Sequence, residues 1–498
     1  MRALSARIPK IAAPVVASWM MSSGPASAQT PIPPHPDRLE YPALEYQLPP
    51  ASTFRAVLSN GMVVYVAEDR VLPTFDMSVT VRAGAFLDPP GKEGLASLVG
   101  EQLRDGGTVS RTPEELDERV EFLAASLSSG LGDTGGSASV GLLSKDLDEG
   151  LGLLVEMLRH PRFDADRLRL SKERHLQNIK RRNDSTASIE RTEWGFLMNG
   201  EDHFSNRHSS SASIEAITRE DLVAYHQRYY HPGNMIVAVA GDFERARMLA
   251  RLEQAFADWP IGETGPTAFP PPTTAPAPGV YLIHKDDVNQ GRVSIGHLAV
   301  MRGSPDEHAL EVMNGILGAS GFRSRLVAKV RSDEGLAYSV GSSFEQGVDY
   351  PGDFRCFFQS KSNSCAYAAQ LVIHEINRIR TEPPDPQDVD DTVNYLVESF
   401  PQRFPSKMAV LSAYVRDEYT GRDPGYWQTY IQAVKRVTPA DVLRVAKQYL
   451  HPDRLVVLAV GDAPALLAGG HDKQPDLNLD DLGQVIQLPL RDPDTRKR

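Results

Sequence analysis

The chain has 498 residues and a formal net charge of -12, from 65 Asp and Glu against 53 Lys and Arg. That length exceeds a single hydrophobic core and predicts about two to four domains. The acidic balance argues against a nucleic-acid-binding protein, because no basic face dominates. With 2 cysteines, the sequence also excludes a disulfide-stapled scaffold and a Cys-rich zinc module.

The N-terminus has the pattern of an export signal. Positive charges precede a short, mostly apolar stretch at 11–21, and the sequence at 26–28 is a small-x-small cleavage site. The apolar stretch is too short to span a bilayer, although an uncleaved anchor remains the alternative. We therefore expect residues 1–28 to be a signal peptide and the mature chain to be exported, with no integral membrane segment. In a Gram-negative source it would be periplasmic, and residues 29–53 would form a Pro-rich arm.

Residues 54–257 are predicted to form the first of two α+β domains. The first two strands flank Asn60-Gly61, a strong short-range signal for a β-hairpin. Hairpins followed by runs of helix favour a mostly antiparallel sheet with helices packed on one face. The pattern predicts a third strand at 75–83 and helices at 94–104, 112–125 and 147–158.

A long repeat indicates that this domain is duplicated. The stretch that begins Ile217-Thr-Arg-Glu-Asp-Leu recurs 220 residues later as Val437-Thr-Pro-Ala-Asp-Val. Each copy predicts a helix capped by Thr218 or Thr438, a His-Pro stop, and a buried strand. A period of this length is typical of a duplicated domain and not of a solenoid.

The second copy is expected at 280–465, after a Pro-rich linker at 258–279 and before a loose tail at 466–498. Its Cys356 lies in an expected strand, so Cys356 and Cys365 either pair or, as we favour, stay unlinked and buried. The predicted elements of this half are strands at 279–285, 292–299, 353–360 and 455–460 and helices at 306–317 and 324–330.

The stretch at 84–101 reads GAFLDPPGKEGLASLVGE. It resembles the opening of the pitrilysin/insulinase-type zinc metallopeptidases, in the branch that includes the mitochondrial processing peptidase. The repeat and the stretch at 318–340 are similar to the same family, so the resemblance covers residues 50–465. It implies two duplicated α+β domains, together forming half of a clam-shell-like metallopeptidase.

Active members of that family carry His-x-x-Glu-His on a helix, where two His bind zinc and the Glu polarises the attacking water. The matching positions are Ser97, Gly100 and Glu101, so both imidazoles and the general base are absent. At the stretch matching the acidic third ligand, the chain has Gln177 and Asn178, which bind zinc poorly. We therefore expect no metal in this chain and no catalysis by this chain alone.

The remaining histidines do not rebuild such a site, because none pairs at i, i+4 with an acid between. His203 and His208 lie in a polar stretch and are expected to be solvated. His231 and His451 precede Pro at a helix end and are expected to act as caps. Further histidines are His175, His226, His284 and His297.

The second half keeps another signature, RSDEGLAYSV at 331–340. The resemblance implies that Arg331 and Tyr338 reach into an active site. In the two-chain branch of the family, that active site belongs to the partner subunit. A guanidinium and a phenol donate hydrogen bonds to a carbonyl or an oxyanion. The alternative is that Arg331 pairs with Asp333 or Glu334 while Tyr338 packs under the sheet. Glu334 departs from the family, which often has a basic residue there.

Two functions remain open. The first is a non-catalytic subunit of a heterodimeric zinc metallopeptidase for small or unfolded peptides, in which a zinc-bearing homologue supplies the metal and this chain supplies Arg331 and Tyr338. The second is a catalytically inactive peptide-binding or structural scaffold of the same fold. A lone hydrolase of another class is disfavoured, because the sequence has no Gly-x-Ser-x-Gly elbow and no P-loop lysine in its Gly-rich stretch.

Overall fold

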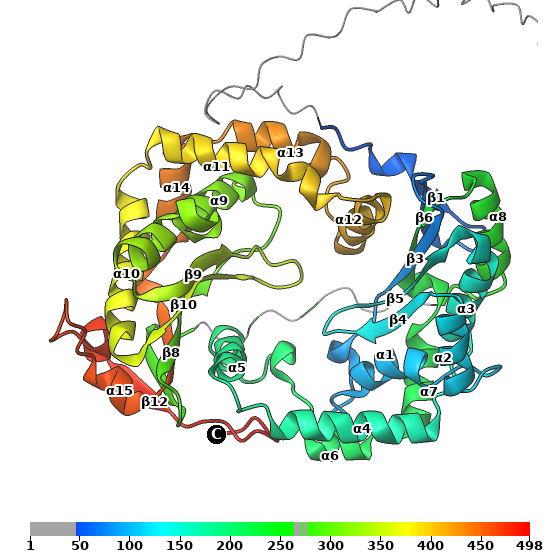
Figure 1. Ribbon diagram of the computed structural model, residues 1–498, viewed down its shortest axis with the longest axis horizontal. Coiled ribbons are helices and arrows are strands. Elements are labelled where there is room, and N and C mark those ends of the chain that lie inside the picture. Colours follow the sequence, from blue (N-terminus) through cyan, green and yellow to red (C-terminus); the bar gives the residue numbers. More distant parts are fainter. Residues whose placement is uncertain (1–45, 263–268, 270–271, 273–275) are drawn as a thin grey trace, which may run out of the picture. The chain divides into compact units, whose positions relative to one another are not determined.

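The computed structural model describes residues 46–262, 269, 272 and 276–498 (Figure 1). The expected signal peptide, most of the Pro-rich arm and half of the linker lie outside the described residues. Within the described part of the chain, no helix is long and apolar enough to cross a membrane.

The first half of the chain forms a six-stranded sheet in the order β1-β2-β6-β3-β5-β4. Every neighbouring pair is antiparallel except β2 and β6, which run parallel. The expected hairpin at Asn60-Gly61 joins the first two strands. The strands are β1 (Arg55–Val57), β2 (Val63–Glu68), β3 (Thr74–Val81), β4 (Ser126–Leu131), β5 (Gly136–Leu143) and β6 (Met235–Gly241).

The second half forms another six-stranded sheet, in the order β12-β7-β11-β8-β10-β9. The β12–β7 and β7–β11 pairs are parallel, and the other pairs are antiparallel. Five strands follow the order of the first sheet, which confirms the α+β fold and the duplication. The strands are β7 (Gly279–His284), β8 (Gln290–Leu298), β9 (Ala337–Phe344), β10 (Asp353–Lys361), β11 (Val456–Gly461) and β12 (Val485–Leu488).

Each sheet carries helices of its own half on one face. The first half contains α1 (Leu95–Asp105), α2 (Pro113–Phe122), α3 (Leu147–Arg159), α4 (Ala165–Lys180), α5 (Thr186–Asn199), α6 (Ser211–Ala216), α7 (Arg219–Tyr229) and α8 (Arg245–Phe256). The second half contains α9 (Glu307–Asn314), α10 (Cys365–Thr381), α11 (Pro386–Glu398), α12 (Lys407–Thr420), α13 (Tyr426–Lys435), α14 (Pro439–Tyr449) and α15 (Ala463–Ala468). Two segments, Gly315–Ala319 and Val327–Asp333, are π-helical where ordinary helix was expected.

The opposite face of each sheet is covered by a helix from the other half of the chain. Helix α5 packs against β8 and β11, and α12 packs against β2 and β6. Side chains alternate accordingly: in β11, Val457 and Ala459 join one apolar core while Leu458 and Val460 join the core that contains α5. The expectation of helices on one face was therefore incomplete, because local periodicity does not say which distant helix covers the second face.

The duplicated capped helices are confirmed in detail. Thr218 and Thr438 each accept a hydrogen bond from the N–H three residues on, and the side chains of Asp221 and Asp441 complete a capping box in both copies. Each helix leads through a His-Pro turn into a central strand that is buried along its whole length. This unit therefore supplies the middle of both sheets.

Two expectations about the second half are decided by packing. The tail expected to be loose is ordered, because β12 pairs with β7 and Arg491 is only 4% exposed. Cys356 and Cys365 are both buried and free, as favoured over a disulfide. Burial raises the pKa of the Cys365 thiol to about 12, so both groups are protonated, apolar-like core side chains.

Candidate functional site

The helix that carries the zinc-motif positions is α1, and its start is fixed by the acidic-Pro loop before it. The carboxylate of Asp88 accepts hydrogen bonds from the N–H groups of Gly94 and Ala96, both at 2.8 Å. Burial raises the pKa of Asp88 to about 6, although these N–H groups favour its charged form. Asp88 therefore acts as a buried cap that orients α1.

Gly100 stands where the family has its general base, and it is a packing residue here. A Cβ at this position would lie 2.3 Å from the backbone N of Leu131 and 2.8 Å from the carbonyl carbon of Gly130. Both neighbours belong to β4, and the Ser129 hydroxyl donates to the Gly100 carbonyl at 2.6 Å. The edge strand thus lies directly on the helix backbone, where no side chain has room.

Glu101 stands where the second zinc-binding His would be, and its carboxylate is already bound. Arg174 Nη2 donates to Glu101 Oε2 at 2.9 Å, and His175 Nε2 lies 2.8 Å from Glu101 Oε1. Burial alone would raise the pKa of Glu101, but the contacts with His175 and Arg174 lower it below its usual value. Sequence reasoning named His175 only as a scattered histidine, since 74 residues separate it from Glu101.

The other positions do not complete a metal site. Ser97 is partly buried on α1, while Gln177 and Asn178 are exposed on α4, one turn beyond the residues that face α1. The placement of Gln177 and Asn178 as counterparts of a third ligand is therefore not matched by the packing. Among the described residues, no group of three or more His, Cys, Asp or Glu side chains is arranged to hold a metal ion. These residues do not fit the zinc that the family implies.

Arg331 lies near the end of the second π-helical segment and Tyr338 near the start of β9, on either side of the turn that joins these elements. The guanidinium carbon of Arg331 is 5.0 Å from the centre of the Tyr338 ring, a cation–π contact. The Tyr338 side chain is 86% exposed, so the alternative in which it packs under the sheet is wrong. The structure therefore presents a guanidinium and a phenol side by side at the surface.

The turn between Arg331 and Tyr338 is held in place by glycine geometry and by ion pairs. Gly335 has a φ of +65°, the left-handed conformation that glycine adopts readily, and forms the turn. The Glu334 carboxylate accepts from Lys473 Nζ at 2.6 Å and from Lys329 Nζ at 3.4 Å. The acid that departs from the family is thus bound by two lysines, one of them in the segment expected to be a loose tail.

The histidines expected to be solvated or capping are instead packed. His203 is 1% exposed and contacts the rings of Phe204 and Tyr350, and burial lowers the pKa of His208 to about 4. His231 is 7% exposed, and its Nδ1 contacts the Ile261 carbonyl. These residues stabilise the fold, and their polar sequence surroundings gave no sign of the aromatic neighbours.

Comparison with known proteins shows which family and which relatives this chain resembles. Residues 216–396 match the family model described as Peptidase M16 inactive domain. A Helicobacter pylori protein named non-peptidase homolog YmxG is 24% identical over 404 residues, which cover 79% of this chain and 90% of that protein. An Arabidopsis thaliana protein named probable mitochondrial-processing peptidase subunit beta is 21% identical over 420 residues, covering 81% of this chain and 77% of its own length.

A solved structure agrees with these matches. The crystal structure of a peptidase M16 inactive domain from Pseudomonas fluorescens superimposes with a TM-score of 0.74 at 24% identity, covering 82% of this chain and 98% of that one. The shared fold, the duplicated sheets and the substituted motif on α1 agree with one another. Residues 216–396 therefore match the peptidase M16 inactive domain, and the chain as a whole is similar to M16-type proteins, with other residues at the positions of the inverted zinc motif.

Proposed function

We propose that this chain is the non-catalytic subunit of a heterodimeric zinc metallopeptidase that cleaves small or unfolded peptides. In this proposal a homologous subunit supplies an intact His-x-x-Glu-His site, and this chain supplies Arg331 and Tyr338. The observation that carries the proposal is the contact between Arg331 and the exposed Tyr338 across an anchored turn. Tyr338 is 86% exposed, so its ring and its phenol O–H are accessible to a partner or a substrate.

The chemistry of the pair suits a supporting role in peptide hydrolysis. A guanidinium presents donors to a carbonyl oxygen, and a phenol O–H donates to the oxyanion that forms as water attacks. Neither group activates water by itself, and on α1 this chain has Gly100 where the base would stand. The proposed division of labour therefore assigns water activation to the partner and oxyanion contacts to this chain.

The test is co-expression with a homologue that carries His-x-x-Glu-His, ideally one encoded next to this chain, followed by cleavage of an unstructured fluorogenic peptide. We expect the pair to exceed the homologue alone, and Arg331→Ala or Tyr338→Phe to reduce kcat by about a hundredfold. Matched controls are Arg454→Ala and Tyr395→Phe, which alter an exposed arginine and an exposed tyrosine elsewhere. Equal rates with and without this chain, or equal effects of the controls, would refute the proposal.

A second candidate is a catalytically inactive scaffold that binds peptides or a partner strand. It is favoured by the occupied Glu101 carboxylate and by the edge position of β4, whose outer side is available to an added strand. This candidate requires the chain alone to bind a peptide as a homodimer. Sedimentation of the purified chain with a labelled unstructured peptide distinguishes it from the heterodimer.

We also propose that the chain is exported and, in a Gram-negative source, acts in the periplasm. The support is the charged, apolar and small-residue pattern of residues 1–28. Cell fractionation and N-terminal sequencing of the mature protein test this directly. A mature protein in the cytoplasm that begins before residue 29 would exclude it.

A further inference from the structure

The segment after β12 places a buried arginine on helix α5. Figure 1 shows this segment, in red, running from β12 toward the end of α4. Arg491 is 4% exposed, and its guanidinium carbon lies 3.6 Å from the centre of the Phe196 ring. An arginine so far removed from water requires partners for its charge and for all its N–H groups.

Every N–H group of Arg491 has an acceptor. Nε donates to Glu193 Oε2 at 2.9 Å, and Nη2 donates to Glu193 Oε1 at 3.3 Å. Nη1 and Nη2 donate to the two carboxylate oxygens of Glu201 at 2.9 and 2.5 Å. The remaining Nη1 hydrogen goes to the carbonyl oxygen of Arg496 at 2.8 Å. Five donors and one ring face are thus matched, which is the complete recognition surface of a guanidinium.

The acceptors are presented by local structure. Glu193 and Phe196 are three residues apart on α5 and share a face of the helix. Gly200, with a φ of +88°, ends the helix and turns the chain so that Glu201 lies beside them. Glu193 is 2% exposed, so its charge is also withdrawn from water and depends on Arg491 and on Arg498, which contacts the same carboxylate. Burial opposes the charge of Arg491, but hydrogen bonds to Glu201 and Glu193 raise its pKa above the usual value.

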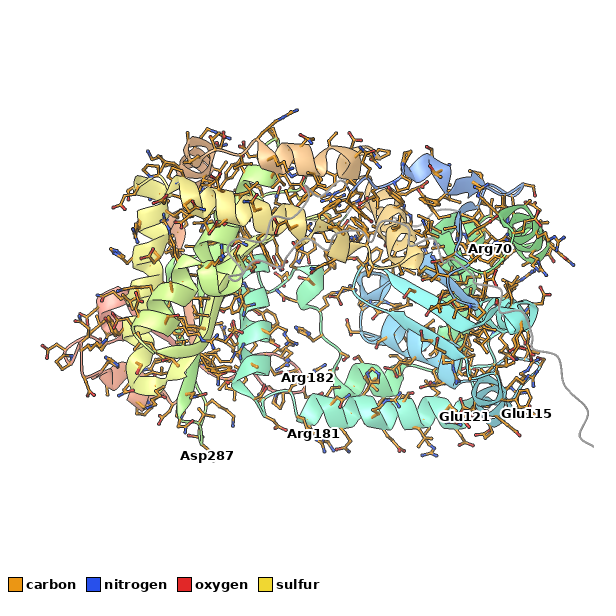
Figure 2. All side chains as sticks on the ribbon, turned by 45° about the horizontal axis from the view of Figure 1, so that its top comes forward. Arg70, Glu115, Glu121, Arg181, Arg182 and Asp287 are labelled. Carbon is orange, nitrogen blue, oxygen red and sulfur yellow. The ribbon has the colours of Figure 1, made fainter. Side chains whose placement is uncertain are left out.

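The same segment is held by the connection between α4 and α5. Asn183 Nδ2 donates to the Arg491 carbonyl at 2.8 Å, and Arg182 Nη1 donates to the Pro493 carbonyl at 3.2 Å. Arg182 lies in this connection, just beyond the end of α4 (Figure 2). Arg496 Nη1 donates to Asn183 Oδ1 at 3.0 Å. The contacts therefore join the edge strand of the second sheet to a connection in the first half of the chain.

We propose that Glu193, Phe196 and Glu201 form a guanidinium-binding site, and that the chain's own Arg491 fills it, making residues 489–498 a latch across the two halves. The ligand class is an arginine side chain on an extended segment. A lysine has three donors on a single nitrogen and cannot satisfy both carboxylates and the ring face. This inference is independent of the proposed peptidase role.

The test is hydrogen–deuterium exchange of the full chain, read on the amides of β12 and of residues 489–498. We expect Arg491→Ala to speed exchange there by about a hundredfold or more, because it removes the buried partner of Glu193 and leaves that carboxylate only the partly exposed Arg498. Arg491→Lys should restore only part of the protection. The matched control is Lys497→Ala, which removes an exposed cation from the same segment and should change nothing.

Chemical rescue separates a guanidinium site from a merely structural arginine. Ethylguanidinium added to Arg491→Ala should restore protection, and ethylammonium at the same concentration should not. Equal effects of the two cations, no rescue by either, or unchanged exchange in Arg491→Ala would overturn the proposal. If Arg491→Ala does not fold, Glu201→Gln replaces it, since the Glu201 side chain is 59% exposed and the amide removes its charge and one of the five acceptors. About tenfold faster exchange is expected there, and no change would refute the latch.

Discussion

Replacing Gly100 by alanine tests whether the lost zinc motif is built into the packing of this chain. The added Cβ would meet the backbone N of Leu131 at 2.3 Å, the carbonyl carbon of Gly130 at 2.8 Å and its Cα at 2.9 Å. Ordinary carbon contacts begin near 3.4 Å, so β4 must move by about 1 Å or α1 must tilt. The neighbours are backbone atoms of a strand paired to β5, and a rotamer change cannot relieve them.

Two effects set the expected change in the free energy of unfolding of Gly100→Ala. Overpacking of a close backbone contact costs about 1–3 kcal/mol, and we expect the upper end because no flexible side chain can give way. Alanine in place of glycine inside a helix contributes about 1 kcal/mol in the opposite direction. The net expectation is a loss of about 2 kcal/mol in the free energy of unfolding. Gly152 supplies the matched control, because it lies in α3 with nothing within 4 Å of the position of its Cβ.

The assay is urea denaturation followed by circular dichroism, comparing the transition midpoints of Gly100→Ala, Gly152→Ala and the parent chain. We expect the first variant to unfold at lower urea and the second at equal or higher urea. A Gly100→Ala variant as stable as Gly152→Ala would refute the packing argument. The same argument predicts that Ser97→His, Gly100→Glu and Glu101→His together bind no stoichiometric zinc by metal analysis, and stoichiometric zinc in a folded protein would contradict it.

Three further predictions concern individual side chains. Burial lowers the pKa of His297 to about 4, and its Nε2 accepts the His451 N–H at 3.0 Å, so the folded state prefers the neutral ring. The contribution of His297 to the free energy of unfolding is therefore complete above about pH 6.5 and is lost as pH falls toward 4, by about 3 kcal/mol in all. His297→Gln should flatten this part of the curve of urea midpoint against pH. An unchanged slope would contradict the assignment. Thr438→Ala should cost about 1 kcal/mol by urea denaturation, while Thr438→Ser should cost little, and equal losses would exclude capping as the cause. Glu190 is 2% exposed and paired with Arg355, so Glu190→Ala should lower the free energy of unfolding by about 3–5 kcal/mol. The double variant with Arg355→Ala should lose less than the sum of the two single losses, and additive losses would contradict a direct pair.

Much of the fold follows from local pattern. The hairpin at Asn60-Gly61, the capped helices at Thr218 and Thr438 and the central strands depend on turn chemistry, capping and periodicity, which short stretches of sequence contain. The repeat extends these local units to two similar domains, and the matching strand orders bear it out. The π-helical segments were missed because helical periodicity does not separate α from π geometry.

For the candidate site too, some features follow from the sequence and others only from the tertiary structure. The sequence by itself determined that α1 lacks both imidazoles and the general base, because chemistry is fixed by residue identity. Only the tertiary structure decided that β4 occupies the space where a Gly100 side chain would lie, that His175 contacts Glu101, and that Tyr338 is exposed beside Arg331. It also turned an expected loose tail into a bound segment, since Arg491 and Glu193 are 298 residues apart. Contacts at such separations depend on how the sheets and helices pack, and no local pattern of residues specifies them.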